Sequence, residues 1–252
     1  MKGATLAAAS LSLLLGCGGE RQAEPTRLGA EPSARELSVR WAGPEEGEAP
    51  VVVLLHGWGA PGDDLVPLAG HLRRRAGVRV AVPAAPLERP PTGRAWWPID
   101  PEGLRRPTDR GEETPPGLAE ARRDLIALLE RLHARGRIEP SRTVLAGFSQ
   151  GAMLATAASL EWSERPAALV IMSGGPVDEA RWRSRMERAP RAVFMSHGRG
   201  DPLLRFDAAE RLRGHFERGG TEVTFVPFEG GHTIPDSVLD RLVSFIRATV
   251  AP

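Results

Sequence analysis

Short apolar runs alternate along the chain with segments in which apolar residues recur at helical spacing, starting at about residue 36. The run Val51–Leu55 (VVVLL) is continuously apolar and rich in β-branched residues, as in a strand buried on both faces. The segment Asp63–Arg75 instead places Leu65, Leu68 and Leu72 on one helical face. This alternation predicts an α/β fold, with a mainly parallel sheet covered by helices on both faces.

The other predicted elements continue the same alternation. The predicted strands are Glu36–Trp41 at a half-exposed edge, Val51–Leu55, Val78–Val82, Thr143–Ala146, Ala168–Met172, Arg191–Ser196 and Glu222–Phe228. The predicted helices are Asp63–Arg75, Leu118–Arg135, Ser149–Leu160, Asp178–Arg188, Phe206–Arg218 and Ser237–Val250. The stretch Pro83–Pro116 holds nine prolines and is expected to be irregular. Ligand sites in such sheets lie at the carboxyl ends of the strands, so the loops that follow strands are the candidates for a site.

Composition adds little to this picture. The chain has 252 residues, enough for one large domain, and 41% of them are apolar. Lys plus Arg number 33 and Asp plus Glu number 32, so there is no charge excess that would indicate a nucleic acid partner. Neither heptads nor a long apolar edge predict an oligomeric state.

The N-terminal segment is predicted to direct export. An apolar run of signal-peptide length, too short for a membrane span, ends in LLGC at residues 14–17. This ending resembles the lipobox of bacterial lipoproteins, which implies cleavage before Cys17 and a lipid on it; the alternative is an ordinary secretory signal. We expect a signal peptide at residues 1–16, a flexible tether at 17–35 and a folded domain at 36–252. The mature protein would then be anchored outside the cytoplasm to a bacterial cell-envelope membrane.

Ser149 lies in AGFSQGA (residues 146–152), between a predicted strand and a predicted helix. This is the setting of a nucleophile elbow, in which a strained turn presents a reactive serine. Gly147 and Gly151 would let the turn pass the sheet and helix without Cβ clashes. The N-terminus of the helix would direct its partial positive charge at the reacting centre. The alternative is a glycine-rich helix start with a capping serine.

A serine needs a base and an acid to become a nucleophile. His232 lies in a glycine-rich loop after the last predicted strand, and Asp201 directly follows the strand Arg191–Ser196. Both come after Ser149 in the chain, and both fall at the expected edge of the sheet. The other histidines are His56 and His197, expected to shape tight turns, and His71, His133 and His215, expected at the surface of helices. The other carboxylates are Asp178 and Asp207, expected to cap helices, and Glu229, which is nearly adjacent to His232.

Four segments together, LLHGWGAPGDDL, AGFSQGAML, SHGRGDPLL and GGHTIP, resemble in order and spacing the carboxylesterase and acyl-protein thioesterase family of α/β-hydrolases. The resemblance runs from about residue 50 to the C-terminus. It implies an α/β-hydrolase fold, with Ser149 as nucleophile, Asp201 as acid and His232 as base. The main-chain N–H groups of Trp58 and Gln150 would form the oxyanion hole. The implied substrate is a small carboxylic ester or thioester, and no cofactor or metal is implied.

Two further features stay open. The segment RAWWPID (residues 94–100) is similar to the family's aromatic segment at the acyl site, so Trp96 and Trp97 would either line the substrate or pack under the neighbouring loop. The stretch Glu88–Pro116 would be either a lid or a surface excursion. The family's well-studied thioesterases are intracellular, whereas this chain has the features of an exported protein. A serine peptidase and a non-catalytic binding lipoprotein are the alternative functions.

Overall fold

The computed structural model describes residues 33–99 and 114–251. Its described helices and strands belong to the unit Ala34–Pro252. Cys17, the predicted signal peptide and nearly all of the predicted tether lie outside the described residues, as does the middle of the stretch Glu88–Pro116. Within the described ranges, no helix is long and apolar enough to span a bilayer.

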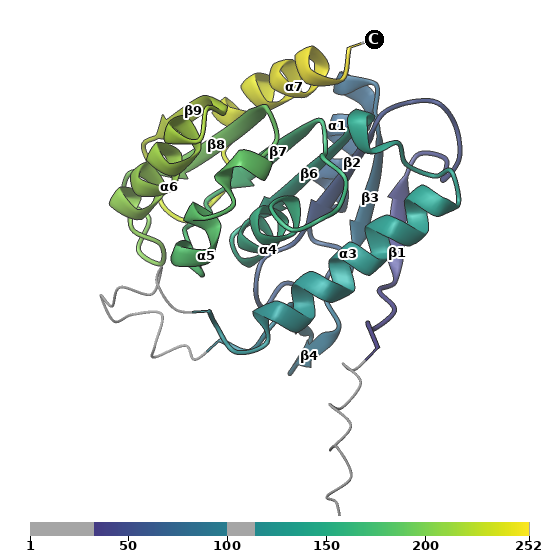
Figure 1. The fold of residues 1–252 in the computed structure, drawn as a ribbon, viewed down its shortest axis with the longest axis horizontal. Helices are drawn as coiled ribbons and strands as arrows, with labels where there is room; N and C mark the ends of the chain where they lie inside the picture. Colours follow the sequence, from purple (N-terminus) through teal and green to yellow (C-terminus); the bar gives the residue numbers. More distant parts are fainter. Residues whose placement is uncertain (1–32, 100–113, 252) are drawn as a thin grey trace, which may run out of the picture. The chain divides into compact units, whose positions relative to one another are not determined.

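A seven-stranded sheet forms the centre of this unit, with strand order β1-β3-β2-β6-β7-β8-β9 (Figure 1). All neighbouring strands run parallel except β1, which pairs antiparallel with β3 at one edge. The fold class predicted from the alternation is therefore confirmed. The strands are β1 (Val39–Ala42), β2 (Val51–Leu55), β3 (Arg79–Pro83), β6 (Thr143–Phe148), β7 (Ala168–Met172), β8 (Ala192–Gly198) and β9 (Glu222–Phe228).

Helices cover both faces of the sheet (Figure 1). Alternate residues of β2 show the division: Val51, Val53 and Leu55 belong to one apolar cluster, and Val52 and Leu54 to another. The first cluster also takes residues of α3 (Leu118–Ala134), α4 (Gln150–Ser159), α5 (Glu179–Arg183) and α6 (Phe206–Arg218). The second takes residues of α1 (Val66–Ala76) and α7 (Asp236–Val250).

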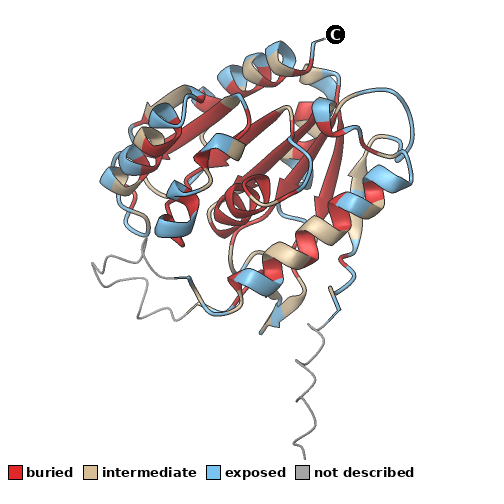
Figure 2. Ribbon diagram, viewed as in Figure 1, coloured by how far each residue is buried: buried red, intermediate tan, exposed pale blue. Residues whose placement is uncertain are grey.

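Burial explains why these elements form. Every residue of β2, β3 and β7 is buried, so the three strands appear red along their length in Figure 2. Full burial of one Leu or Val side chain contributes roughly 1.5–3 kcal/mol, which favours strands apolar on both sides in the middle of the sheet. The edge strand β1 is only half buried, in keeping with the alternating pattern of its residues.

Two predicted segments differ in the structure. The stretch expected to be irregular contains a small antiparallel hairpin of β4 (Leu87–Arg89) and β5 (Gly93–Ala95). Each strand has three residues, too few to give a recognisable alternation in the sequence. The single helix predicted over Asp178–Arg188 is instead the short α5 followed by a 3-10 turn, Met186–Arg188.

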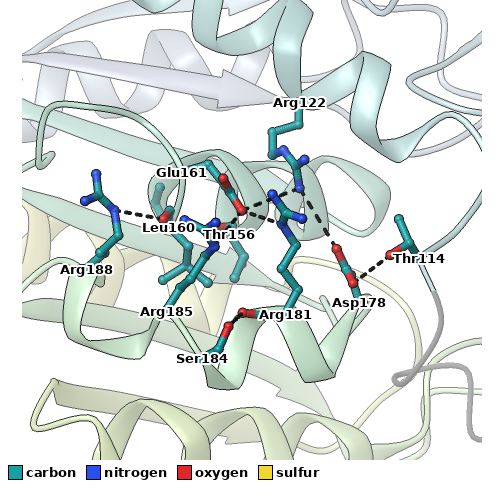
Figure 3. Close-up of polar contacts among 11 residues, drawn as sticks. Thr114, Arg122, Thr156, Leu160, Glu161, Asp178, Arg181, Ser184, Arg185 and Arg188 are labelled. Atoms are coloured by element: carbon teal, nitrogen blue, oxygen red, sulfur yellow. Dashed lines mark hydrogen bonds and ion pairs between the residues drawn. The ribbon is translucent and has the colours of Figure 1, made fainter.

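A cluster of charged side chains joins α3, the end of α4 and α5 on the first face (Figure 3). Glu161 follows α4 and accepts a hydrogen bond from Arg181 Nε at 2.5 Å. Arg185 Nε lies 3.0 Å and Arg122 Nη1 3.8 Å from the same carboxylate oxygen. Burial would raise the pKa of Glu161, but the hydrogen bond from Arg181 and the charge of Arg122 outweigh it and hold the pKa below its usual value. Glu161 therefore stays ionised and ties the three segments together.

Asp178 takes part in this cluster rather than capping a helix. It has a left-handed backbone (φ 52°), and its side chain makes no cap bond to α5. Instead Asp178 Oδ1 accepts a hydrogen bond from Thr114 Oγ1 at 2.7 Å, and Arg122 Nη1 lies 4.0 Å from Oδ2. Asp207 lies in the first turn of α6, as predicted, but the N-cap residue is Arg205; the Asp207 carboxylate pairs with Arg205 at 2.9 Å, and the main-chain N–H of Ala208 also lowers its pKa.

One of the three helical histidines is not at the surface as predicted. His215 of α6 is buried, and its Nε2 hydrogen-bonds Glu179 Oε1 at 2.5 Å. His71 is half-buried and His133 is exposed. The helical position of His215 is evident from the sequence, but its buried partner comes from α5, 36 residues away.

Candidate active site

Ser149 lies at the turn between the central strand β6 and α4. Its backbone is in a region that non-glycine residues rarely adopt, with φ 54° and ψ −119°. Its N–H donates to the carbonyl of Met172 at 2.9 Å, which fixes the turn to the end of β7. The side chain of Ser149 does not cap α4, so the alternative of a capping serine finds no support. The strained turn has the conformation expected of a nucleophile elbow.

The two glycines beside Ser149 are required by close approach of main chains. A Cβ on Gly147 would overlap the main chain of Gly151, and would lie 2.5 Å from the nitrogen of Ala152. A Cβ on Gly151 would overlap the carbonyl of Leu55 and lie 2.5 Å from the oxygen of His56. A larger residue at position 147 would push against α4, and one at position 151 would push against the end of β2, so both glycines set the position of Ser149.

His232 and Asp201 meet across the loops that follow β8 and β9. His232 Nδ1 donates to Asp201 Oδ2 at 2.7 Å, which leaves Nε2 as the free ring nitrogen. The other carboxylate oxygen, Oδ1, accepts the main-chain N–H groups of Leu203 at 2.8 Å and Leu204 at 2.9 Å. The imidazole packs on Phe148, with ring centroids 4.9 Å apart. The carboxylate is thus held by its own loop and in turn orients the imidazole.

The environment of Asp201 favours its ionised form. Burial alone would raise the pKa of this carboxyl, but hydrogen bonds from His232 and from the N–H groups of Leu204 and Leu203 hold the pKa below its usual value. His197, predicted to shape a turn, donates from Nε2 to the carbonyl of Leu204 at 2.8 Å and so supports the same loop. Glu229 is exposed and pairs with Arg199 at 3.3 Å.

A cavity of about 290 Å³ brings the predicted nucleophile and base to one place. Ser149 and His232 both line it. Ser149 Oγ makes no hydrogen bond to another residue in the described part of the chain. Such contacts are often long before a substrate binds. The rest of the lining is Gly57, Trp58, Gly59, Ala60, Asp64, Ile99, Phe148, Gln150, Met153, Leu203 and Leu204.

The predicted oxyanion donors belong to this cavity too. Trp58 and Gln150 line it together with Ser149. In the described ranges, neither main-chain N–H donates to a protein acceptor. The Trp58 loop is fixed by Gly59, whose N–H donates to Arg94 O at 2.7 Å, and by Ala60 O, which accepts from Arg94 N at 2.8 Å. Two N–H groups without a protein acceptor, on residues that line the cavity, are suited to binding an oxygen that gains negative charge.

The two tryptophans assigned to the substrate are core residues instead. Trp96 and Trp97 are 1% and 2% exposed, and neither lines the cavity. Their main chains bind the side chain of Gln150: Trp96 N–H donates to Oε1 at 3.0 Å, and Nε2 donates to Trp97 O at 2.9 Å. The substrate contact expected of these indoles is therefore not seen, and the packed alternative describes them. Ile99, from the same segment, lines the cavity in their place.

His56 completes a buried network behind the cavity. Its Nδ1 donates to Gly57 O at 2.8 Å and its Nε2 accepts the N–H of Ala85 at 3.0 Å. Trp96 Nε1 donates to the carbonyl of His56 at 2.9 Å. Burial is the main cause that lowers the pKa of His56, so the ring stays neutral. The turn-shaping role predicted for His56 agrees with these contacts.

Two features of the site are not among those predicted from the sequence. The side chain of Gln150 fixes the segment of Trp96 and Trp97, whereas the prediction concerns only the N–H of Gln150. Asp64 lines the cavity without a predicted role; its place shortly after the HGWG loop is the signal that could have found it.

No group of three or more His, Cys, Asp or Glu within the described ranges could hold a metal ion.

Comparison with known proteins shows the family of the chain. The chain matches a family model described as Phospholipase/Carboxylesterase over residues 40–250. It is 28% identical over 211 residues to Acyl-protein thioesterase 1 of Eremothecium gossypii, and the aligned region covers 79% of this chain and 87% of that protein. The crystal structure of esterase PE8 is similar at a TM-score of 0.75 and 31% identity, covering 85% of this chain and 100% of that one. A carboxylesterase from Mesorhizobium loti shares the fold at a TM-score of 0.68 and 20% identity, covering 86% and 95% of the two chains. The chain therefore belongs to the phospholipase/carboxylesterase family of α/β-hydrolases.

Proposed function

We propose that this family member is a serine hydrolase that cleaves carboxylic esters through an acyl-enzyme on Ser149, with His232 as base and Asp201 as acid. The observation that carries the proposal is the 2.7 Å contact between His232 Nδ1 and Asp201 Oδ2, beside a cavity that His232 and Ser149 both line. The strained turn at Ser149 supports the same assignment. The names of esterase PE8 and of the Mesorhizobium loti carboxylesterase indicate ester substrates for those relatives.

The proposed reaction proceeds in two halves. His232 Nε2 takes the proton of Ser149 Oγ while Oγ bonds to the carbonyl carbon, and the oxyanion binds the N–H groups of Trp58 and Gln150. The bond to the alcohol oxygen then breaks, and Nε2 returns its proton to that oxygen. In the second half, water gives a proton to Nε2 and its oxygen bonds to the acyl carbon. The bond to Oγ breaks, Oγ regains the proton, and the acid leaves. Asp201 stabilises the imidazolium that forms in each half.

The cavity favours short acyl chains. Its volume of about 290 Å³ lies at the small end of ligand pockets, which run from about 300 to 1,000 Å³. We therefore expect acetyl and butyryl esters to be cleaved better than long-chain ones. One relative is named a thioesterase, so the panel includes butyryl thioesters beside oxygen esters.

Hydrolysis of para-nitrophenyl butyrate tests the proposal directly. The parent should turn over and Ser149→Ala should not, while circular dichroism shows both to be folded. The matched control is Ser141→Ala, because Ser141 is an exposed serine whose side chain bonds Glu139 at 3.4 Å. Equal activity in the parent and the Ser149 variant would contradict the assignment. Faster cleavage of the matching anilide than of the ester would favour the peptidase alternative.

On the sequence alone, we also propose that Cys17 carries lipid and anchors the protein to a cell-envelope membrane. The support is the apolar run that ends in LLGC at residues 14–17. Cys17→Ser should move the expressed protein from the membrane fraction to the soluble fraction of a bacterial host. An unchanged distribution would contradict lipidation without affecting the esterase proposal.

A further inference from the structure

The cavity wall contains one feature that ester hydrolysis does not use. The cavity is largely apolar, with walls formed by Trp58, Ile99, Phe148, Met153, Leu203 and Leu204. Asp64, from the loop between β2 and α1, is the one carboxylate among the described residues that line it. Asp64 is exposed, so water reaches its carboxylate, but the residue also forms part of the cavity lining.

The main-chain N–H groups of Asp64 and Leu65 favour the ionised form of this carboxylate, but the described part of the protein places no cation against it. Across residues 33–99 and 114–251, no Arg, Lys or His nitrogen lies within 4.0 Å of the Asp64 carboxylate. The neighbouring carboxylate, Asp63, does have a cation, with Arg40 Nη1 at 3.9 Å. The titratable groups that act on Asp64 are His56, whose charged form would favour the ionised carboxylate, and Asp63, which has the same sign as Asp64 and opposes it. Burial is the main cause that raises the pKa of Asp64.

Two arginines of the β4–β5 hairpin have other partners. The guanidinium of Arg89 stacks on the indole of Trp58, with its Cζ 3.6 Å from the ring centroid. Arg94 donates from Nη1 to Ala85 O at 2.9 Å, and its Nη2 lies 4.0 Å from Glu88. Within the described ranges, the cavity is therefore lined by an exposed carboxylate that no cation of the protein pairs with.

We propose that Asp64 is a specificity-determining residue that selects ester substrates carrying a positively charged ammonium group in the alcohol or the acyl part. The inference rests on the proposed esterase function. The ester carbonyl would lie at Ser149, its apolar carbons against Phe148 and Met153, and the ammonium at the carboxylate of Asp64. A neutral substrate of the same shape would leave the carboxylate unpaired, and an anionic one would be repelled.

Two pairs of substrates of equal shape separate charge from size. The first pair is butyrylcholine, the butyrate ester of choline, and a neutral analogue in which a quaternary carbon replaces the ammonium nitrogen of the alcohol part. The second pair consists of two para-nitrophenyl esters. One has a quaternary ammonium group in its acyl chain, and the other has a quaternary carbon in the same place. Each pair is measured with the parent, with Asp64→Asn and with Asp63→Asn, by titration of released acid. Asp63→Asn is the matched control, because Asp63 is the adjacent carboxylate but does not line the cavity.

The parent should prefer the cationic member of at least one pair by on the order of fivefold in kcat/KM, the size expected of an ion pair that water still reaches. This ratio should fall close to one in Asp64→Asn and persist in Asp63→Asn. The pair that responds identifies which part of the substrate lies at Asp64. Absence of a preference in both pairs, or a preference that survives in Asp64→Asn, would overturn the proposal.

Binding separates this inference from the esterase proposal. Calorimetric titration of Ser149→Ala with the same four molecules measures affinity without turnover. The cationic member should bind more tightly, by a similar factor, and this advantage should be lost when Asp64→Asn is added. If the parent hydrolyses none of the esters while this difference in affinity holds, the esterase proposal fails and the role of Asp64 stands. Equal affinities within both pairs would refute the role of Asp64 whatever the activity.

Discussion

His232 Nδ1 lies 2.7 Å from Asp201 Oδ2, although the two residues come from different loops. Asp201 Oδ1 is at the same time bound by the N–H groups of Leu203 and Leu204. The carboxylate therefore has little freedom to move, and it directs the remaining ring nitrogen of His232 away from itself. This relationship gives the proposed base its tautomer and orientation.

Asp201→Asn should lower kcat by about 10³–10⁴-fold, because an amide does not hold the imidazole in the required tautomer or stabilise its cationic form. Steady-state hydrolysis of para-nitrophenyl butyrate measures the loss. Asp207→Asn is the control, since Asp207 is an aspartate that pairs with Arg205 and does not line the cavity. Activity close to that of the parent in Asp201→Asn would argue against a triad.

The lowered pKa of Asp201 also leads to a prediction of how the stability of the protein depends on pH. The pKa of Asp201 is lower in the native protein than its ordinary value, so the unfolded chain binds its proton more readily. The resulting stabilisation is complete above the unfolded pKa of about 3.9 and is lost as pH falls through the lower native pKa. Urea unfolding between pH 7 and pH 3 should show a shallower acid loss in Asp201→Asn than in the parent. Parallel curves would show that Asp201 is not coupled to folding in this way.

Replacement of Gly151 by alanine should destabilise the protein by about 1–3 kcal/mol or more, because the added methyl group overlaps the main chain at the end of β2. The displacement would also move Ser149, so activity should fall even in the folded fraction. The control is Gly175→Ala, since Gly175 has no heavy atom within 4 Å of an added Cβ. Chemical denaturation of both variants compares the two sites. A loss of equal size in each would contradict the account of the turn.

Gln150→Met keeps the volume of the side chain and removes its two hydrogen bonds to the main chain of Trp96 and Trp97. Since a shift of about 1 Å in a positioned group can cost on the order of 100-fold in rate, we expect kcat to fall by roughly 10- to 100-fold. KM should change little, because the cavity lining is retained. A rise in KM at constant kcat would instead place this side chain in substrate binding.

The order of strands and helices could be predicted because the central strands are buried on both faces. Runs such as Val51–Leu55 and Ala168–Met172 therefore contain no polar residue. The hairpin of β4 and β5 could not, because strands of three residues give no periodicity. The surface position predicted for His215 is wrong for a different reason: its burial depends on Glu179, a partner distant in sequence.

For the site, the sequence could indicate which residues carry the chemistry but not how they are supported. Ser149, Asp201 and His232 each follow a strand, and parallel strands bring such loops to one edge. The hydrogen bonds of Gln150 join residues 53 and 54 positions apart, and only the fold brings them together. The sequence leaves open whether Trp96 and Trp97 line the substrate or pack under the neighbouring loop, and the structure buries both.

The most direct test of the central claim is chemical labelling of the nucleophile. The protein is treated with a fluorophosphonate, which forms a covalent bond to an activated serine, and the adduct is located by mass spectrometry of the digested protein. We predict a single adduct on Ser149 in the parent, none in Ser149→Ala, and much slower labelling in His232→Ala. An adduct on a different serine, or labelling of the His232 variant at the parent rate, would contradict the account.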